Sequence, residues 1–240
     1  MGVIRGLATL LFIIAIPVAL IGTNVRYLAN EERVYEYAFD EYDAPARMGI
    51  ARAELMRASA ELREYFNNDA DAFFTRVETG GKEVPLFNDR EIAHLKDVKQ
   101  LFGFVFTAHE IAFVYILAYV VAIFIWAREK PLRSLAVQSL IGSALTIGFI
   151  AFLAVFAISG FERAFEQFHL IAFTNDLWQL DPATDRLIQM FPEEFWFDVT
   201  ILTGLLTVVE AAIICILATI HIGVSRRVEA ASFVASGERV

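Results

Sequence analysis

The sequence predicts an all-α membrane protein in which four transmembrane helices carry a mainly helical extracytoplasmic cap. Of its 240 residues, 57% are hydrophobic and 20% are charged, whereas roughly a quarter of the residues in soluble domains are charged. The hydrophobic residues are concentrated in long stretches, and the mean hydropathy of the chain is +0.53. Stretches of about 20 apolar residues can cross a hydrocarbon core of roughly 30 Å. We therefore expect a single membrane domain over residues 1–240.

The predicted transmembrane helices cover about residues 7–28, 101–126, 135–159 and 199–224. The first of them contains Pro17 and stands where a cleaved signal peptide would stand. Its apolar run is longer than that of a signal peptide, and no small-x-small cleavage pattern precedes the acidic residues that follow. We therefore expect this helix to remain in the protein as an uncleaved anchor.

Basic residues near the helix ends predict the orientation in the membrane. They are Arg5, then Arg128, Lys130 and Arg133, and finally Arg226 and Arg227. Lysine and arginine are enriched in cytoplasmic connections, so both termini and the loop 127–134 are expected in the cytoplasm. The segments 29–100 and 160–198 are then extracytoplasmic. They carry 10 basic with 16 acidic residues and 2 basic with 8 acidic residues, respectively, which gives each a net charge of −6.

Charge and cysteine content exclude several classes of function. The chain has a formal net charge of −9, whereas a nucleic-acid-binding domain needs a basic face. The single cysteine, Cys215, lies inside an apolar run, so a disulfide framework and a cysteine-based metal motif within one chain are both excluded.

The extracytoplasmic segments contain signals for further helices. An amphipathic helix is expected over residues 43–68, and the turn residues at 79–82 predict a short hairpin or loop. Asn88 and Glu91 form a capping-box pattern that starts a helix, and this helix is expected to continue into the second transmembrane helix. A short helix is expected over residues 184–190.

Two histidines are the first candidate site. His94 lies about two turns, or roughly 10–14 Å, before an apolar boundary, and His169 lies about nine residues beyond another. We expect the second and third transmembrane helices to extend by similar lengths and to bring both imidazoles to the same height. Neutral imidazoles act as acid and base near pH 7. Asp97 is expected to orient one of them, and Asn175 and Asp176 to orient the other or polarise a carbonyl. The alternative is two exposed, unrelated histidines.

A metal site is a weaker hypothesis. His94, Asp97, His169 and Asp176 could supply ligands for zinc, but no H-x-x-x-H or H-E-x-x-H pair is present. We therefore predict no metal.

Ionisable residues inside the predicted membrane helices are another candidate site. His109, Glu110 and Glu210 are costly at such depth, which favours a function such as a proton relay or an ion path. The alternative is hydrogen bonding between helices. Cys215 lies in an apolar run and no serine stands in a G-x-S-x-G context, so a protein nucleophile is not expected, and in an enzyme the substrate would supply it.

Three stretches of the chain carry a resemblance to a known family. They are residues 54–67 (ELMRASAELREYFN), 88–102 (NDREIAHLKDVKQLF) and 168–182 (FHLIAFTNDLWQLDP), the last continuing to MFPEEF at 190–195. With the four-helix layout, they span most of the chain. The sequence resembles the lipoprotein intramolecular transacylases, a family of bacterial membrane proteins.

The resemblance implies a reaction and a set of site residues. The family moves the sn-2 acyl chain of a diacylglyceryl lipoprotein onto the α-amino group of its N-terminal cysteine, giving a lyso-lipoprotein, without a cofactor. Its two histidines correspond to His94, in H-L-x-D-V, and His169, in F-H-x-x-x-x-x-N-D-L-W. One would act as base, for which we favour His169, and the other as acid. The supporting residues implied are Asp97, Asn175 as an oxyanion donor and Asp176, with Trp178 and Arg90 binding the substrate.

Two other functions remain open from the residues alone. One is a small-solute or proton-coupled transporter that uses Glu110 and Glu210, although the chain has no inverted repeat. The other is a non-catalytic membrane scaffold with an acidic cap. The expected partners are a diacylated lipoprotein and membrane lipid, and no nucleic acid.

Overall fold

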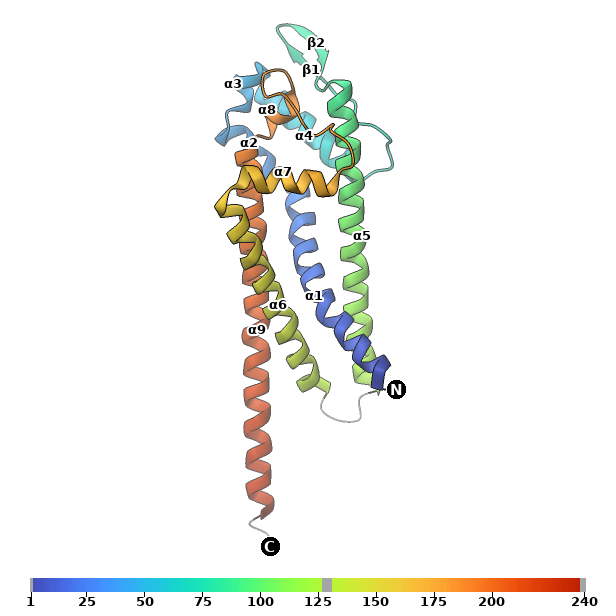
Figure 1. The fold of residues 1–240 in the computed structure, drawn as a ribbon, viewed down its shortest axis with the longest axis vertical. Coiled ribbons are helices and arrows are strands. Elements are labelled where there is room, and N and C mark those ends of the chain that lie inside the picture. The colour runs from blue at the N-terminus through green and yellow to red at the C-terminus, as the bar shows by residue number, and fades with distance from the viewer. Residues whose placement is uncertain (1, 127–130, 238–240) are drawn as a thin grey trace. The chain divides into compact units, whose positions relative to one another are not determined.

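The computed structural model describes the backbone of residues 2–126 and 131–237, and the side chains of these residues except 126 and 229–237. The helices are α1 (Gly2–Asn30), α2 (Glu32–Glu41), α3 (Ala44–Met48), α4 (Arg52–Phe66), α5 (Asp89–Trp126), α6 (Pro131–Ser159), α7 (Phe161–Ala172), α8 (Arg186–Met190) and α9 (Glu193–Gly237). Among the described residues, two strands follow α4 and precede α5 in the chain: β1 (Arg76–Thr79) and β2 (Lys82–Pro85) (Figure 1). Arg128 and Lys130, on which part of the predicted orientation depends, lie outside the described residues.

In the part of the chain that the structure describes, four helices are long and apolar enough to cross a membrane, namely α1, α5, α6 and α9. This confirms the predicted fold class. The helices α5 and α9 begin well before the apolar stretches predicted at 101–126 and 199–224. An apolar run marks only the part of a helix that lies in hydrocarbon, so the polar turns outside it give no such signal.

The chain forms two compact units. Unit 1 takes in residues 1–24, 108–153 and 204–240, and unit 2 takes in residues 25–107 and 154–203. Each spanning helix contributes residues to both units. The division therefore does not test the prediction of a single membrane domain.

Unit 1 is a helix bundle with an apolar surface. Large hydrophobic side chains such as Val114 and Leu217 are more than half exposed, as expected for side chains that face lipid. Glycines allow close packing inside the bundle: a Cβ atom on Gly142 would lie 2.6 Å from Cδ1 of Ile16. Small residues at such points let helix backbones approach closely in a membrane.

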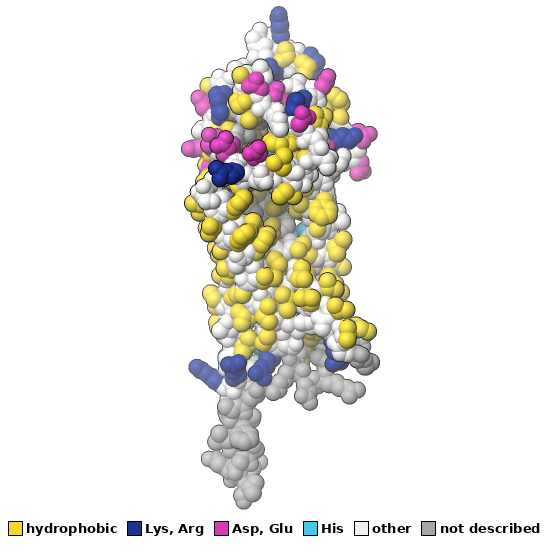
Figure 2. All heavy atoms as spheres, viewed as in Figure 1, with side chains coloured by type: hydrophobic (Ala, Val, Ile, Leu, Met, Phe, Trp, Pro, Cys, Tyr) yellow, Lys and Arg dark blue, Asp and Glu magenta, His cyan; other side chains and the backbone are white. Residues whose placement is uncertain are grey.

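Unit 2 has a hydrophobic core of its own. Its buried residues come from α2, α4, α8 and the starts of α5 and α9, and include Phe39, Leu55, Leu62, Met190 and Phe191. On the face drawn in Figure 2, acidic side chains gather on the surface of this unit. Unit 2 corresponds to the mainly helical cap that the sequence predicts.

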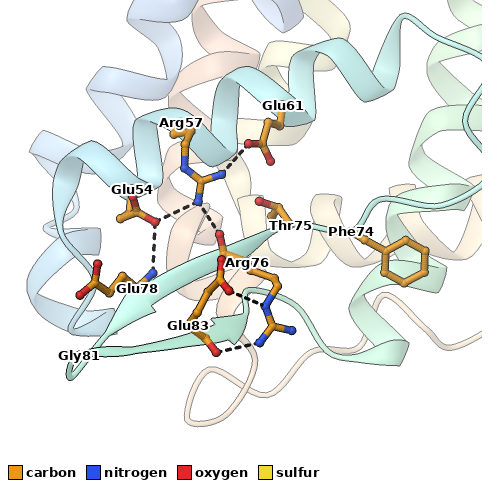
Figure 3. A pocket seen from close by; sticks show the side chains of 9 residues that line it. All are labelled: Glu54, Arg57, Glu61, Phe74, Thr75, Arg76, Glu78, Gly81 and Glu83. Carbon is orange, nitrogen blue, oxygen red and sulfur yellow. Dashed lines mark hydrogen bonds and ion pairs between the residues drawn. The ribbon is translucent and has the colours of Figure 1, made fainter.

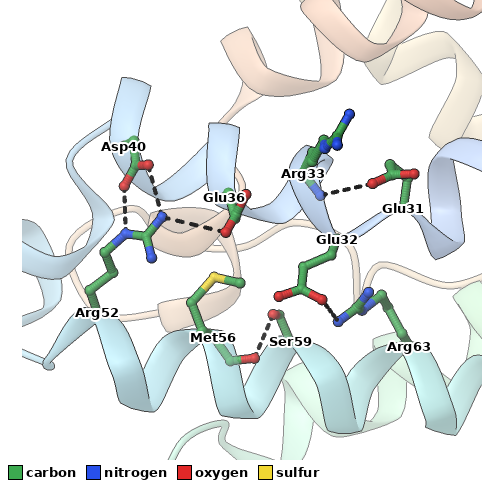
Figure 4. Close-up of polar contacts among 9 residues, drawn as sticks. All are labelled: Glu31, Glu32, Arg33, Glu36, Asp40, Arg52, Met56, Ser59 and Arg63. Atoms are coloured by element: carbon green, nitrogen blue, oxygen red, sulfur yellow. Dashed lines mark hydrogen bonds and ion pairs between the residues drawn. The ribbon is translucent and has the colours of Figure 1, made fainter.

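The helix predicted over residues 43–68 is wrong in detail, because the structure divides it into α3 and α4. Gly49 ends α3 with a positive φ of 63°, a left-handed conformation that terminates helices. The helix α2 was not predicted. It packs against α4, and ion pairs join the two helices: Arg52 to Asp40 at 2.7 Å and Arg63 to Glu32 at 3.3 Å (Figure 4).

The predicted turn at 79–82 is confirmed as a β-hairpin. Gly80 and Gly81 both have positive φ, as a two-residue hairpin turn requires. The outer edge of β1 is covered by α4, because Glu54 accepts a hydrogen bond from the backbone N–H of Glu78 and Arg57 donates to the carbonyl of Arg76 (Figure 3). An edge covered in this way is protected from pairing with another chain.

The predicted extension of the third transmembrane helix to His169 is wrong. α6 ends at Ser159, and a separate helix, α7, begins after Gly160. His169 therefore lies on a helix whose direction is independent of α6. The predicted extension of the second transmembrane helix to His94 is confirmed, because α5 runs without a break from Asp89 through the apolar stretch.

Candidate active site

His94 lies one turn inside the start of α5. The backbone N–H of Asn88 donates to Oε2 of Glu91 at 2.8 Å, and the N–H of Glu91 donates to Oδ1 of Asn88 at 3.0 Å. This reciprocal pair is the predicted capping box. The helix is thus fixed immediately before His94, whose side chain is turned inward and is only 6% exposed.

His169 lies near the end of α7 on the buried face of that helix and is 7% exposed. Its Nδ1 atom is 2.7 Å from the carbonyl oxygen of Phe165, one turn earlier. Its ring stacks on the indole of Trp178, with centroids 4.9 Å apart and an interplanar angle of 28°. The contact with Phe165 at the ring edge and the stacking on Trp178 at the ring face therefore both limit movement of the imidazole.

The two imidazoles face each other in unit 2. Their ring centroids are 6.1 Å apart. Phe173 contacts both rings, at 5.3 Å from His94 and 5.6 Å from His169. The structure thus brings together the two histidines that the sequence singles out, although they stand 75 positions apart.

The segment between α7 and α8 is fastened to α5 by the other predicted site residues. Nδ2 of Asn175 donates to Oδ2 of Asp97 at 2.8 Å. The guanidinium of Arg90 donates to the carbonyl of Asp176 and is 3.9 Å from the carboxylate of the same residue. The indole N–H of Trp178 donates to the carbonyl of Asn175 at 3.0 Å. The polar groups expected to orient the imidazoles therefore bond to one another. Trp178, which was predicted to bind the substrate, stacks on His169, and Arg90 is bonded to Asp176, so substrate binding by these two residues stays a prediction.

Burial favours the neutral form of both imidazoles by lowering the pKa of each. The loss of solvent, followed by the nearby His169, lowers the pKa of His94 from 6.5 to about 4, while Asp97 opposes this shift. Burial also lowers the pKa of His169, and the carbonyl of Phe165 opposes that shift. Both residues lie outside the apolar stretches. A neutral imidazole offers one N–H donor and one lone pair.

A model of the lipoprotein intramolecular transacylase (Lit) family matches residues 10–196. The chain belongs to this family. An uncharacterised protein of Aquifex aeolicus (strain VF5) is 28% identical to the chain over 207 residues, which are 85% of this chain and 89% of that protein. The family resemblance that the sequence motifs indicate is therefore confirmed. Membership of a transacylase family supports the prediction that the protein is an enzyme.

Solved structures of a lipoprotein intramolecular transacylase share the fold. The membrane-integral Lit from Bacillus cereus matches with a TM-score of 0.76 at 22% identity, over 95% of this chain and 100% of that chain. A variant of that protein with one histidine replaced by alanine matches with a TM-score of 0.72 at 21% identity, over 94% of this chain and 97% of that one. These matches confirm the membrane-integral, all-α fold.

Several residues of the site were not predicted from the sequence. Phe165 and Phe173 stand four positions before and after His169, and both rings contact its imidazole. That spacing was a usable signal, because residues four apart share a helix face. Glu91 was predicted only as a helix cap, yet it is 1% exposed and also bonds to α8.

Among the described side chains, those of residues 2–125 and 131–228, no three histidine, cysteine, aspartate or glutamate residues are placed to hold one metal ion. A cleft of about 570 Å³ lies between α4 and the β1–β2 hairpin (Figure 3). The charges in it are used locally: Arg57 pairs with Glu54 and Glu61, and Arg76 pairs with Glu83. The cleft is therefore explained by the contact in which α4 covers the edge of β1.

Polar residues of unit 1 form hydrogen bonds between helices. Nε2 of His109 is 3.0 Å from the hydroxyl oxygen of Thr23. Nδ2 of Asn24 donates to Oε2 of Glu210 at 3.0 Å and to the hydroxyl of Thr207 at 3.1 Å. These contacts favour the interhelical alternative for His109 and Glu210, while a role for Glu110 stays a prediction.

Proposed function

We propose that this protein moves the sn-2 acyl chain of a diacylglyceryl-modified lipoprotein onto the α-amino group of that lipoprotein's N-terminal cysteine. The observation that carries the proposal is the pair of buried imidazoles, 6.1 Å apart by ring centroids and contributed by two different helices. Membership of the transacylase family supports the same class of reaction.

The proposed step is an isomerisation within one substrate molecule. The amine nitrogen attacks the carbonyl carbon of the sn-2 ester, a C–N amide bond forms, and the ester C–O bond breaks. One proton moves from the nitrogen to the released glycerol oxygen. Because both reacting groups belong to one molecule, a site that holds them in contact gains much of the rate enhancement from proximity.

His169 is the proposed base. A carbonyl oxygen only accepts hydrogen bonds, so the contact with Phe165 requires the proton of the neutral ring to be on Nδ1. The lone pair is then on Nε2, where it can take the proton of the attacking amine. The lowered pKa of His169 supports a ring that is neutral and ready to accept that proton.

His94 is the proposed hydrogen-bond donor. Its pKa of about 4 means that the ring is neutral at pH 7, so it donates as an imidazole and not as an imidazolium. A neutral N–H aimed at the ester oxygens stabilises negative charge as it develops. Asn175, the predicted oxyanion donor, is the second candidate for this role, and one of its two amide N–H groups donates to Asp97.

We also propose that the site faces the outside of the plasma membrane and that both termini are cytoplasmic. The described arginines Arg5, Arg133, Arg226 and Arg227 support this orientation through the positive-inside rule. A diacylated lipoprotein anchored in the outer leaflet would then present its ester and its amine at the surface where the cap lies.

The proposal can be tested with purified protein and a synthetic diacylated lipopeptide in detergent. Product and substrate have the same mass, so the readout is the loss of the free α-amine, together with tandem mass spectrometry that locates an acyl chain on nitrogen. We expect His94→Ala and His169→Ala each to lower the rate by about 100-fold or more. His221→Ala is the matched control and should keep the wild-type rate. Wild-type conversion by both site variants would contradict the proposal.

A further inference from the structure

Two carboxylates are buried where α5 meets the start of α8. Glu91 is 1% exposed and Asp185 is 8% exposed, and neither takes part in the chemistry proposed above. Burying a carboxylate is unfavourable, and apolar side chains of the same size often give equal or greater stability. Their presence therefore calls for an explanation in terms of geometry.

Glu91 joins two helices that are distant in the sequence. Its Oε1 atom accepts a hydrogen bond from the backbone N–H of Leu187 at 2.6 Å, and its Oε2 atom accepts one from the N–H of Asn88 at 2.8 Å. Each oxygen thus receives a backbone donor from a different helix start. Only a group with two acceptors can satisfy both donors.

Asp185 extends the same network. Its Oδ1 atom accepts from Nδ2 of Asn88 at 2.9 Å, and its Oδ2 atom accepts from the N–H of Asp181 at 2.7 Å. Asn88 therefore bonds to both carboxylates. We refer to Asn88, Glu91 and Asp185 as the clamp.

The clamp fixes one end of the segment that touches His169. This segment, residues 173–185, leaves α7 just after His169 and carries Trp178, which stacks on that imidazole. Its far end is held by the clamp, one turn of α5 before His94. Its near end is held by the hydrogen bond between Asn175 and Asp97, one turn after His94.

We infer that Glu91 is a positioning residue, which through Asn88 and Asp185 fixes the segment 173–185 against α5 so that Trp178 holds His169 opposite His94. The inference rests on the proposed function of the two histidines. Glu91 does not touch the reacting atoms, and it acts through Trp178 and the two rings.

Glu91→Gln tests the inference with little change in size. The amide keeps one acceptor oxygen but turns an N–H toward the second backbone donor, so one of the two bonds is lost. We expect kcat to fall by about 10- to 100-fold, since misplacement by about 1 Å costs about that much. The apparent KM should stay within about twofold, because Glu91 is buried and does not itself contact the substrate.

A spectroscopic readout separates positioning from activity. The chain has three tryptophans, so replacing Trp126 and Trp196 by phenylalanine leaves Trp178 as the fluorophore in the full-length protein. An imidazolium in contact quenches indole emission more than an imidazole does. The emission of Trp178 should therefore follow the titration of His169, with a midpoint below 6.5. Glu91→Gln should reduce the amplitude of this change and move the midpoint toward 6.5.

Asp89→Asn is the matched control, because it removes an exposed carboxylate from the same helix turn. It should leave both kcat and the Trp178 titration unchanged. A folded Glu91→Gln protein with both readouts unchanged overturns the inference. If Glu91→Gln does not fold, Asp185→Asn is measured in the same way, and unchanged readouts there have the same meaning. If the wild type lacks transacylase activity while the Trp178 titration still responds to Glu91→Gln, the proposed function fails and the positioning of His169 stands.

Discussion

The carbonyl oxygen of Phe165 determines which nitrogen of His169 carries the proton. The 2.7 Å contact leaves the lone pair on Nε2. No side chain is needed for this control, since the carbonyl belongs to the preceding turn of α7. The same contact limits rotation of the ring, which is also stacked on Trp178.

Replacement of His169 by asparagine should separate folding from activity. The asparagine amide can donate to the carbonyl of Phe165 from about the position of Nδ1, but it offers no base. We expect transacylation to fall by about 10²- to 10⁴-fold, with a thermal unfolding midpoint close to that of the wild type. A variant that keeps its activity would show that His169 is not the base.

The protein should lose stability as the pH falls through the range in which the unfolded chain protonates His94. The pKa of this residue is 6.5 when unfolded and about 4 when folded. As the pH falls, the unfolded chain therefore binds the proton first. The contribution of His94 to the free energy of unfolding is fully present above pH 6.5 and declines toward pH 4, by about 3 kcal/mol in full. The check is the thermal unfolding midpoint at pH 7 and pH 5 for the wild type and for His94→Asn. Equal losses in both proteins would contradict the expectation.

Among the elements, α7 has two unlike faces. His169 is buried, whereas Phe168, Leu170 and Ile171 are 48%, 55% and 85% exposed. An exposed apolar face on a short helix that follows a spanning helix is typical of a helix lying in the membrane interface. Such a position would bring the buried face, with its imidazole, to the level of the lipid esters.

Labelling can test the position of α7. In a Cys215→Ala background, an environment-sensitive fluorophore on Ile171→Cys should show blue-shifted emission in liposomes and be quenched by lipid-borne quenchers. The same fluorophore on Glu166→Cys, an exposed polar position of the same helix, should report water. Similar, water-like emission from both positions would argue against an interfacial helix.

At the scale of the whole molecule, the features that the sequence predicts are those determined by residues close together in the chain. Four apolar runs give the spanning helices, and the Asn88–Glu91 pair gives the start of α5. The break at Gly160 was missed because a single glycine does not reveal whether a helix stops or continues. The distance between His94 and His169 could not be predicted, because it depends on how the segment after α7 packs on α5.

The proposed orientation can be tested by accessibility from outside intact cells. In the Cys215→Ala background, a membrane-impermeant maleimide should label Asp181→Cys without permeabilisation. It should label Arg133→Cys only after the membrane is opened. The reverse pattern would place the histidine pair on the cytoplasmic side.

One unbroken helix, α5, contains both His94 and the apolar stretch that begins near Leu101. Leu101 follows His94 by seven positions along the helix, a rise of about 10 Å at 1.5 Å per residue. This length cannot adjust, whereas the depth of a substrate ester follows the thickness of the bilayer. The rate of acyl transfer should therefore depend on the chain length of the surrounding phospholipids, with an optimum where ester and imidazole lie at the same depth.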